Sequence, residues 1–432
     1  MWKDWKLSRK RAQVATWFKR TPFETSVLIR KRRIRELHSR YSFTSNWKGV
    51  QSNNDSFNRH LNWLFVASLL ASTAPSSIYP KFQPRFYAHL QLGWMLVSYV
   101  WLCLSAFLEF VNITFCLSDL ERLLYGVESL TYILHIAYIM FLAWQWRQRV
   151  QTVFTAIAQF DLEMGYIENC ERSKHFVQLQ LWLVGILGVS AFIIDFGYHK
   201  WNLCKWLLSI GTYVLPNVIS SVSFVQYYVL LQGVAWRLQK INQFLRQELF
   251  SFDPNCKPQR PTVQKLRGLQ AQLIRFTKSV NRVYEVSILF VYVGSFVNFN
   301  LNLFLAYKTI DRPETSGWFW WSYMILWLGM HMGKMFSILF FNHLVQLEQS
   351  NCLALMFKVR LSDSHHLIES CKHFVLQLQT RIRENVVCGV IQLDLQFITA
   401  LTMATTNVFI FLLQYDITFE ALSKPANDTK TV

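Results

Sequence analysis

The hydrophobic positions of this chain gather in long stretches that are separated by polar segments. A helix needs about 20 mostly apolar residues to cross the hydrocarbon core of a bilayer, because lipid cannot satisfy exposed backbone groups. Seven stretches meet this length, and each predicts a membrane-spanning helix: 89–112, 123–146, 176–198, 206–235, 284–307, 318–345 and 391–415. The pattern therefore predicts an all-α, polytopic membrane protein.

An eighth apolar stretch, 61–79, is weaker, because its second half consists mainly of Ala, Ser, Thr and Pro. We expect it to form an interfacial or partly inserted helix, and a transmembrane helix is the less favoured alternative.

Three further segments have apolar residues at helical spacing, but they carry too many polar residues to lie in lipid. They are 234–249, 263–283 and 366–388, and the first directly continues the fourth predicted span. We expect these helices to extend the spans and to pack together as a cytoplasmic bundle.

The composition agrees with a membrane protein. Hydrophobic residues make up 52% of the 432 residues and aromatic residues 16%, while only 16% are charged. A soluble domain carries about 25% charged residues. This balance excludes a soluble enzyme, a disulfide-framed secreted module and a disordered chain.

The basic residues predict the orientation, because cytoplasmic loops retain Lys and Arg. With the amino terminus inside and the carboxyl terminus outside, 36 of the 44 Lys and Arg fall on the inner side, seven on the outer side and one, Lys334, within a span. The net charge of +18 then comes from a basic inner face that lies against anionic lipid. We therefore expect no nucleic-acid partner.

This topology divides the chain into seven regions. They are an inner amino-terminal region (1–88, containing 61–79), spans one to four (89–235), an inner helical loop (236–283), spans five and six (284–345), an inner helical segment (346–390), the last span (391–415) and an outer tail (416–432). The sequons at Asn112 and Asn427 would lie outside and be available for glycosylation.

No catalytic chemistry is evident. The sequence has no Gly-rich phosphate loop, no HExxH and no GxSxG, and its eight Cys form no CxxC pair. We therefore expect no enzyme activity, no cofactor and no metal site.

The last predicted span differs from the others, because one of its faces is polar. At 100° per residue, eight positions fall within a sector of about 120°: Gln392, Gln396, Thr399, Met403, Thr406, Asn407, Ile410 and Gln414. All of them except Met403 and Ile410 are polar. Such a face either binds a neighbouring helix or faces water. We favour a water-filled pore that subunits share.

The end of this span resembles that of the insect gustatory receptor family, in which Thr-Tyr, five apolar residues and Gln-Phe often follow a Leu-Asp pair. The matching residues here are Leu393-Asp394, Asn407-Val408, the apolar run 409–413 and Gln414-Tyr415. The number of spans, the short outer loops, the long basic inner loop before the fifth span and the stretch 61–75 also resemble the family over nearly the whole chain.

The resemblance implies a ligand-gated, non-selective cation channel that assembles as a homo- or heterotetramer in the plasma membrane of gustatory neuron dendrites and responds to a small-molecule tastant. It places a pore constriction at Gln414 and Tyr415. With the polar face of the last span, this gives the pore candidates Gln396, Thr399, Thr406, Asn407, Gln414 and Tyr415. The family's ligand pocket lies within each subunit, in the outer half of the earlier spans.

The candidate ligand residues are the aromatic and acidic residues near the predicted outer ends of the spans: Glu128, Tyr132, Asp195, Tyr213, Phe304, Tyr307 and Trp321. Aromatic residues at span ends are also common interface anchors. A carboxyl group a turn inside a span needs a partner, which would be a basic side chain, water or a cationic ligand. An aromatic pocket suits a planar ligand better than a sugar, so we expect a bitter or aversive compound.

Two other functions remain open. A G-protein-coupled-type receptor also has seven helices, but its amino terminus would lie outside, and neither a DRY-like nor an NPxxY-like motif is present. The chain could also be an obligate co-subunit of a heteromeric taste channel, without a ligand of its own.

Overall fold

The structure is a computed structural model, and the residues that it describes belong to one compact unit of the chain, Asn54–Val432. They are residues 61–74, 85–113, 119–145, 147–164, 170–200, 202–250, 260–310, 317–358, 365–381, 386–388, 391–393 and 396–423. The predicted inner segment 1–60, Asn427 and the rest of the tail beyond 423 lie outside the described residues.

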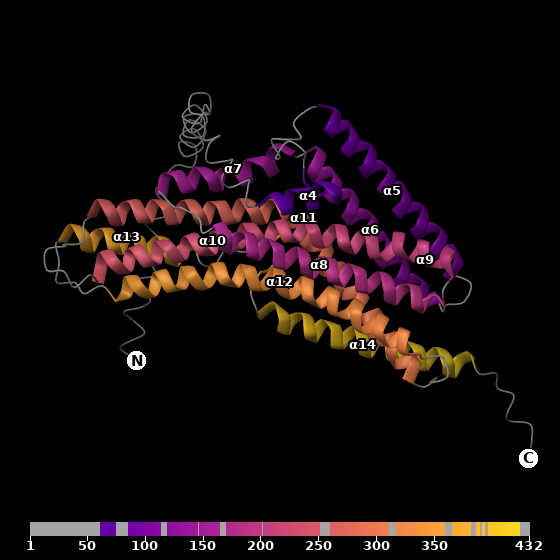
Figure 1. The fold of residues 1–432 in the computed structure, drawn as a ribbon. Helices are drawn as coiled ribbons and strands as arrows, with labels where there is room; N and C mark the ends of the chain where they lie inside the picture. The colour runs from indigo at the N-terminus through magenta and orange to yellow at the C-terminus, as the bar shows by residue number, and fades with distance from the viewer. Residues whose placement is uncertain are drawn as a thin grey trace, which may run out of the picture. The chain divides into compact units, whose positions relative to one another are not determined.

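Helices make up nearly all of the described residues (Figure 1). In chain order the elements are α4 (Asn62–Leu70), α5 (Arg85–Ile113), α6 (Asp119–Trp144), α7 (Arg147–Met164), α8 (Cys170–Tyr198), α9 (Leu203–Ser209), the π-helix η4 (Ile210–Val214), α10 (Leu215–Phe250), α11 (Arg260–Ile310), α12 (Trp318–Phe357), α13 (His365–Arg381), β1 (Val386–Val387), β2 (Ile391–Gln392) and α14 (Gln396–Ser423).

Seven helical segments within the described residues are long and apolar enough to cross a membrane, which confirms the predicted fold class. They correspond to α5, α6, α8, the continuous run from α9 to α10, α11, α12 and α14. The orientation of the two termini stays a prediction.

We call one end of the bundle the short-loop end. It is the end at which α5, α8 and α11 end and α6, α9 and α12 begin.

Two predicted helices join into one in α11, because no helix-breaking residue separates 263–283 from 284–307. Its 51 residues span about 75 Å at 1.5 Å per residue, which exceeds the thickness of a bilayer. Together with the long α10 and α12, it must extend beyond the membrane. The predicted helix at 366–388 is α13, which ends earlier, at Arg381.

The extended parts of α11 and α12 pack against α13, and α11 also packs against α7 (Figure 1). We did not expect α7 from the sequence, although its buried residues Val150, Val153, Phe154 and Ile157 follow helical spacing. These helices form the predicted bundle beyond the spans.

A buried ion pair holds α7 against α10. The guanidinium of Arg237 is fully buried and donates through Nε and Nη2 to the two carboxyl oxygens of Asp161, at 2.6 Å each. Its Nη1 donates to the backbone oxygen of Gly233 at 2.8 Å. Bidentate geometry of this kind fixes both the distance and the rotation between two helices.

The stretch 61–79 forms only the nine-residue helix α4, followed by a turn, and residues 75–79 lie outside the described residues. At about 14 Å, α4 is too short to cross a bilayer. Leu61, Leu64 and Phe65 are buried, and α4 packs against α8 and α10. The side-chain amide of Gln226 on α10 donates to Ser68 and Thr73, which fixes this contact.

The last span begins later than we predicted. Ile391–Gln392 form β2, which pairs antiparallel with β1, so Gln392 lies on a strand and not on the polar face of a helix. Val387, Ile391 and Leu393 are buried, and the N–H of Cys388 donates to Glu285 on α11. These contacts hold the segment extended, and α14 therefore covers Gln396–Ser423 instead of 391–415.

We predict that Arg237→Met will destabilise the bundle, because it leaves the carboxyl group of Asp161 without its bidentate partner. Removing one member of a buried ion pair costs about 3–5 kcal/mol, so thermal unfolding in detergent should begin at a clearly lower temperature. Arg246→Met, at an exposed position on the same helix, is the matched control. Equal unfolding temperatures for the two variants would show that the pair does not hold α7 in place.

Candidate functional site

A cavity of about 660 Å³ opens at the short-loop end, between α5, α6, α8, α9, η4, α11 and α12. Its lining combines carboxyl groups, side-chain amides and aromatic rings with a few Leu and Met side chains. The residues are Glu109, Asn112, Tyr125, Glu128, Gly197, Tyr198, His199, Lys200, Lys205, Leu208, Ser209, Tyr213, Asn298, Leu301, Asn302, Leu305, Gly317, Phe319, Trp320, Tyr323, Met324 and Trp327.

A local helix distortion places Tyr213 in this wall. Pro216 lacks an N–H, and its ring would clash with the carbonyl of Thr212 in a regular helix. The chain widens into the π-helix η4 over Ile210–Val214, one turn ahead of the proline. The sequence pattern did not predict this π-helix.

Glu128 lies at one end of a buried chain of hydrogen bonds. Its Oε1 accepts from the Tyr132 hydroxyl at 3.1 Å and from the Asn298 side-chain amide at 2.5 Å. The Tyr132 oxygen lies 2.9 Å from His331 Nε2, and Ser295 Oγ lies 3.1 Å from His331 Nδ1. Because Tyr132 donates to Glu128, it accepts from Nε2, and Nδ1 accepts from Ser295. The chain thus joins α6, α11 and α12.

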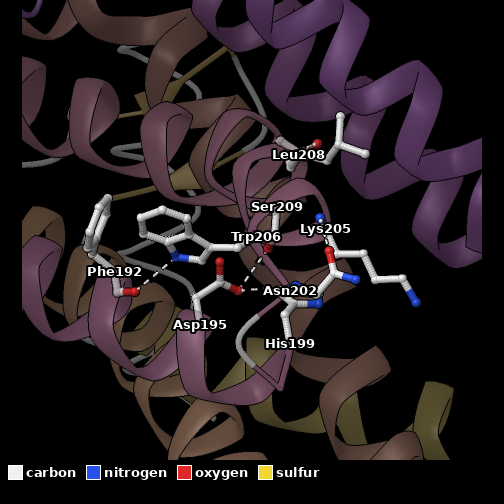
Figure 2. A network of polar contacts seen from close by, with 9 residues as sticks. Phe192, Asp195, His199, Asn202, Lys205, Trp206, Leu208 and Ser209 are labelled. Carbon is white, nitrogen blue, oxygen red and sulfur yellow. Dashed lines mark hydrogen bonds and ion pairs between the residues drawn. The ribbon is translucent and has the colours of Figure 1, made fainter.

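Asp195 is fully buried, and it belongs to a network of polar contacts with the cavity-lining residue Ser209 (Figure 2). Its Oδ1 accepts from Ser209 Oγ at 2.8 Å and lies 3.6 Å from His199 Nε2, while Oδ2 has no hydrogen-bond partner within the described part of the chain. Burial lowers the pKa of His199, and the charge of Lys205 lowers it further, so His199 is mostly neutral near pH 7. The Lys205 side chain extends away from Asp195 in Figure 2.

Glu109 is a third carboxyl group in the cavity wall, and the sequence candidates did not include it. It is only 8% exposed, and its Oε2 has no hydrogen-bond partner among the described residues. It lies close enough to Asp195 and Glu128 to interact electrostatically with both. One signal was available, because Glu109 is the single acidic residue of the predicted span 89–112.

The structure brings some of the predicted ligand residues together and leaves others apart. Glu128 and Tyr213 line the cavity, Tyr132 packs edge-on against Tyr213 with ring centroids 6.3 Å apart, and Asp195 bonds to the lining residue Ser209. The other three residues are not among those that line it: Phe304, Tyr307 and Trp321.

These three residues differ in burial and in contacts. Phe304 is fully buried, with the ammonium of Lys308 4.9 Å from its ring centroid. Tyr307 is half-buried on the same helix. Trp321 packs edge-on against the lining residue Trp320, at 4.8 Å between ring centroids.

An ion triad connects the helices around the cavity to α14. The ammonium of Lys308 on α11 lies 3.1 Å from Glu121 Oε1 on α6 and 3.0 Å from Asp416 Oδ1 on α14. Asp416 follows Gln414 and Tyr415, so the triad holds the segment that the sequence singled out as a pore constriction.

The polar face of α14 is uncovered within this subunit. Gln396, Thr399, Thr406, Asn407 and Gln414 are exposed, and Tyr415 is 41% exposed. Among the described side chains of α14, only Thr405 and Leu412 are buried, and the helix packs on α11. Within the described residues, the polar face is therefore not used as a contact between helices.

Two other predicted features concern modification and metals. Asn112, in the first outer sequon, is exposed and lines the mouth of the cavity, whereas Asn427 lies outside the described residues. Within the described residues, no group of three His, Cys, Asp or Glu side chains is arranged to hold a metal ion.

Comparison with known proteins identifies the class to which this fold and cavity belong. Residues 55–419 match the model of the 7tm chemosensory receptor family, and the chain belongs to this family. It is 44% identical to gustatory receptor 59f of Drosophila melanogaster over 373 residues, which cover 86% of this chain and 91% of that protein. Gustatory receptor 59e of the same fly is 20% identical over 365 residues, covering 78% of this chain and 90% of that protein.

Solved structures share the fold. The insect olfactory receptor OR5 from Machilis hrabei in complex with eugenol matches 82% of this chain and 98% of its own, with a TM-score of 0.61 and 11% identity. OR5 in a second structure matches 84% of this chain and 100% of its own, with a TM-score of 0.62 and 10% identity. The resemblance to insect gustatory receptors is confirmed.

We predict that Tyr132→Phe will destabilise the spans, because it leaves Glu128 and His331 each without one hydrogen bond in a buried site. An unsatisfied buried polar group costs about 1–3 kcal/mol, which should lower the unfolding temperature in detergent. Tyr307→Phe is the control, since the Tyr307 hydroxyl has no partner among the described residues. The hydrogen-bond chain has no structural role if both variants unfold like the unmodified chain.

Proposed function

We propose that this chain is a taste receptor of the insect gustatory type, a ligand-gated, non-selective cation channel that a small-molecule tastant opens. The observation that carries the proposal is the uncovered polar face of α14, on a helix that lies at the side of its own subunit. A membrane-spanning helix with such a face needs water or a partner subunit to satisfy it.

A pore between subunits meets this need. If four copies place their α14 helices around a common axis, then Gln396, Thr399, Thr406, Asn407 and Gln414 would line a water-filled path, with Tyr415 at its constriction. Amide and hydroxyl groups carry no fixed charge, so they would dehydrate cations weakly and select little among them. The assembly would be a homo- or heterotetramer in the plasma membrane, as in the dendrites of gustatory neurons.

The cavity at the short-loop end is the proposed ligand site. Its volume of about 660 Å³ suits a small organic molecule. Aromatic rings form much of its wall, which favours a planar ligand over a sugar and therefore a bitter or aversive compound. The binding of eugenol, an aromatic molecule, by the olfactory receptor OR5 supports a ligand of this size and shape.

The ion triad offers a route from the cavity to the pore. The cavity residues Asn298 and Leu305 belong to α11, and Lys308 on the same helix pairs with Asp416 on α14. A ligand that moves the end of α11 would move the end of α14 with it, close to Gln414.

The test is to record current from cells that express this chain alone while plant alkaloids and sugars are applied. We expect a current that needs no G protein. Gln414→Ala should change the permeability of Ca²⁺ relative to Na⁺ by roughly twofold or more, because it removes an amide ring from the narrow part of the pore.

The control is Thr405→Ala, at a buried position on the opposite face of α14, which should leave permeability unchanged. A response that disappears when G proteins are blocked would contradict the proposal, and so would an identical ion selectivity in Gln414→Ala and the unmodified channel.

A further inference from the structure

Three carboxyl groups, those of Glu109, Glu128 and Asp195, approach one cavity from three different helices. They are 8%, 3% and 0% exposed, and within the described residues none forms an ion pair with a Lys or Arg. Lys200 and Lys205 also line the cavity, but both are exposed at its rim. Burying like charges without a counter-charge is costly.

Two of these groups leave an oxygen unused. Glu109 Oε2 and Asp195 Oδ2 have no hydrogen-bond partner in the described part of the chain, although both are buried. Trp327, which lines the cavity and is 3% exposed, also leaves its Nε1 donor without a partner. Buried polar groups are nearly always hydrogen-bonded, so these atoms point to a polar occupant.

The wall around the carboxyl groups is aromatic. Tyr125, Tyr198, Trp320, Tyr323 and Trp327 line the same cavity, and Tyr198 stacks on Tyr323 with ring centroids 4.7 Å apart. Aromatic faces attract an organic cation, whose charge is spread over its substituents. A bare metal ion would need several closely spaced ligands, and the described residues offer no such group.

We propose that the cavity binds a small organic cation, an aryl-alkyl amine in its protonated form, with Glu109 as the anchor for the ammonium group. Glu128 and Asp195 supply further negative charge, and the Tyr and Trp rings hold the aromatic part of the ligand. This inference rests on the proposed function only in taking the cavity as the ligand site, and it does not require the chain to conduct ions.

The test uses two probes of the same skeleton, phenethylamine and 2-phenylethanol, which differ in carrying an ammonium or a hydroxyl group. Binding to the full chain purified in detergent is measured by the shift in unfolding temperature and by the change in tryptophan fluorescence, to which Trp320 and Trp327 in the wall contribute. We expect saturable binding of the amine, with the alcohol bound at least about tenfold more weakly, since charged hydrogen bonds are the stronger ones.

Glu109→Gln keeps the size of the side chain and removes its charge. We expect it to weaken amine binding by about tenfold to a hundredfold and to leave alcohol binding unchanged. Glu128→Gln is the second variant, and it should also weaken amine binding. Glu369→Gln, at an exposed position on α13 far along the chain, is the matched control and should bind as the unmodified chain does.

Several results would overturn the proposal. They are equal binding of amine and alcohol, an equal loss of both probes in Glu109→Gln, an unchanged amine affinity in Glu109→Gln, and no saturable amine binding at millimolar concentration. Amine-selective binding by a chain whose response disappears when G proteins are blocked would uphold the ligand class and contradict only the channel. A current from a chain that does not bind the amine selectively would uphold the channel and contradict only the ligand class.

Discussion

A lipid bilayer offers no hydrogen-bond partner, and this constraint governs the structure from its backbone to its side chains. Helices satisfy the backbone, so the polar side chains within the spans must find one another. They do so in the chain from Glu128 through Tyr132 and His331 to Ser295, which joins three helices. Arg237 and Asp161 solve the same problem in the extended bundle, where the fully buried guanidinium pairs with a carboxyl group that is only 13% exposed.

The same constraint makes the polar groups that lack a hydrogen-bond partner informative about function. They include the free carboxyl oxygens beside the cavity and the exposed polar side chains of α14. In the channel that we propose, a ligand would fill the first site, and water or a second subunit would satisfy the second. Lys308 lies between them, because it binds both Glu121 and Asp416.

The spans could be predicted from the sequence because length and hydrophobicity alone decide whether a helix crosses lipid. The local sequence pattern predicted the wrong structure where tertiary contacts determine the conformation. Residues 391–393 are apolar enough to continue a helix, but burial of Ile391 and Leu393 and the contact of Cys388 with Glu285 hold the segment extended. Likewise, only helix packing determines that Glu109 lines the cavity, while Phe304 is buried and is not among the lining residues.

The most direct test of the account is the water accessibility of α14 in the assembled protein. Cysteines introduced one at a time at Thr406, Asn407 and Gln414 should react with a charged, membrane-impermeant thiol reagent, and the reaction should alter the current. Cysteines at the buried positions Thr405 and Leu412 should not react. The opposite pattern, or no reaction at any of the five positions, would contradict a pore along the polar face of this helix.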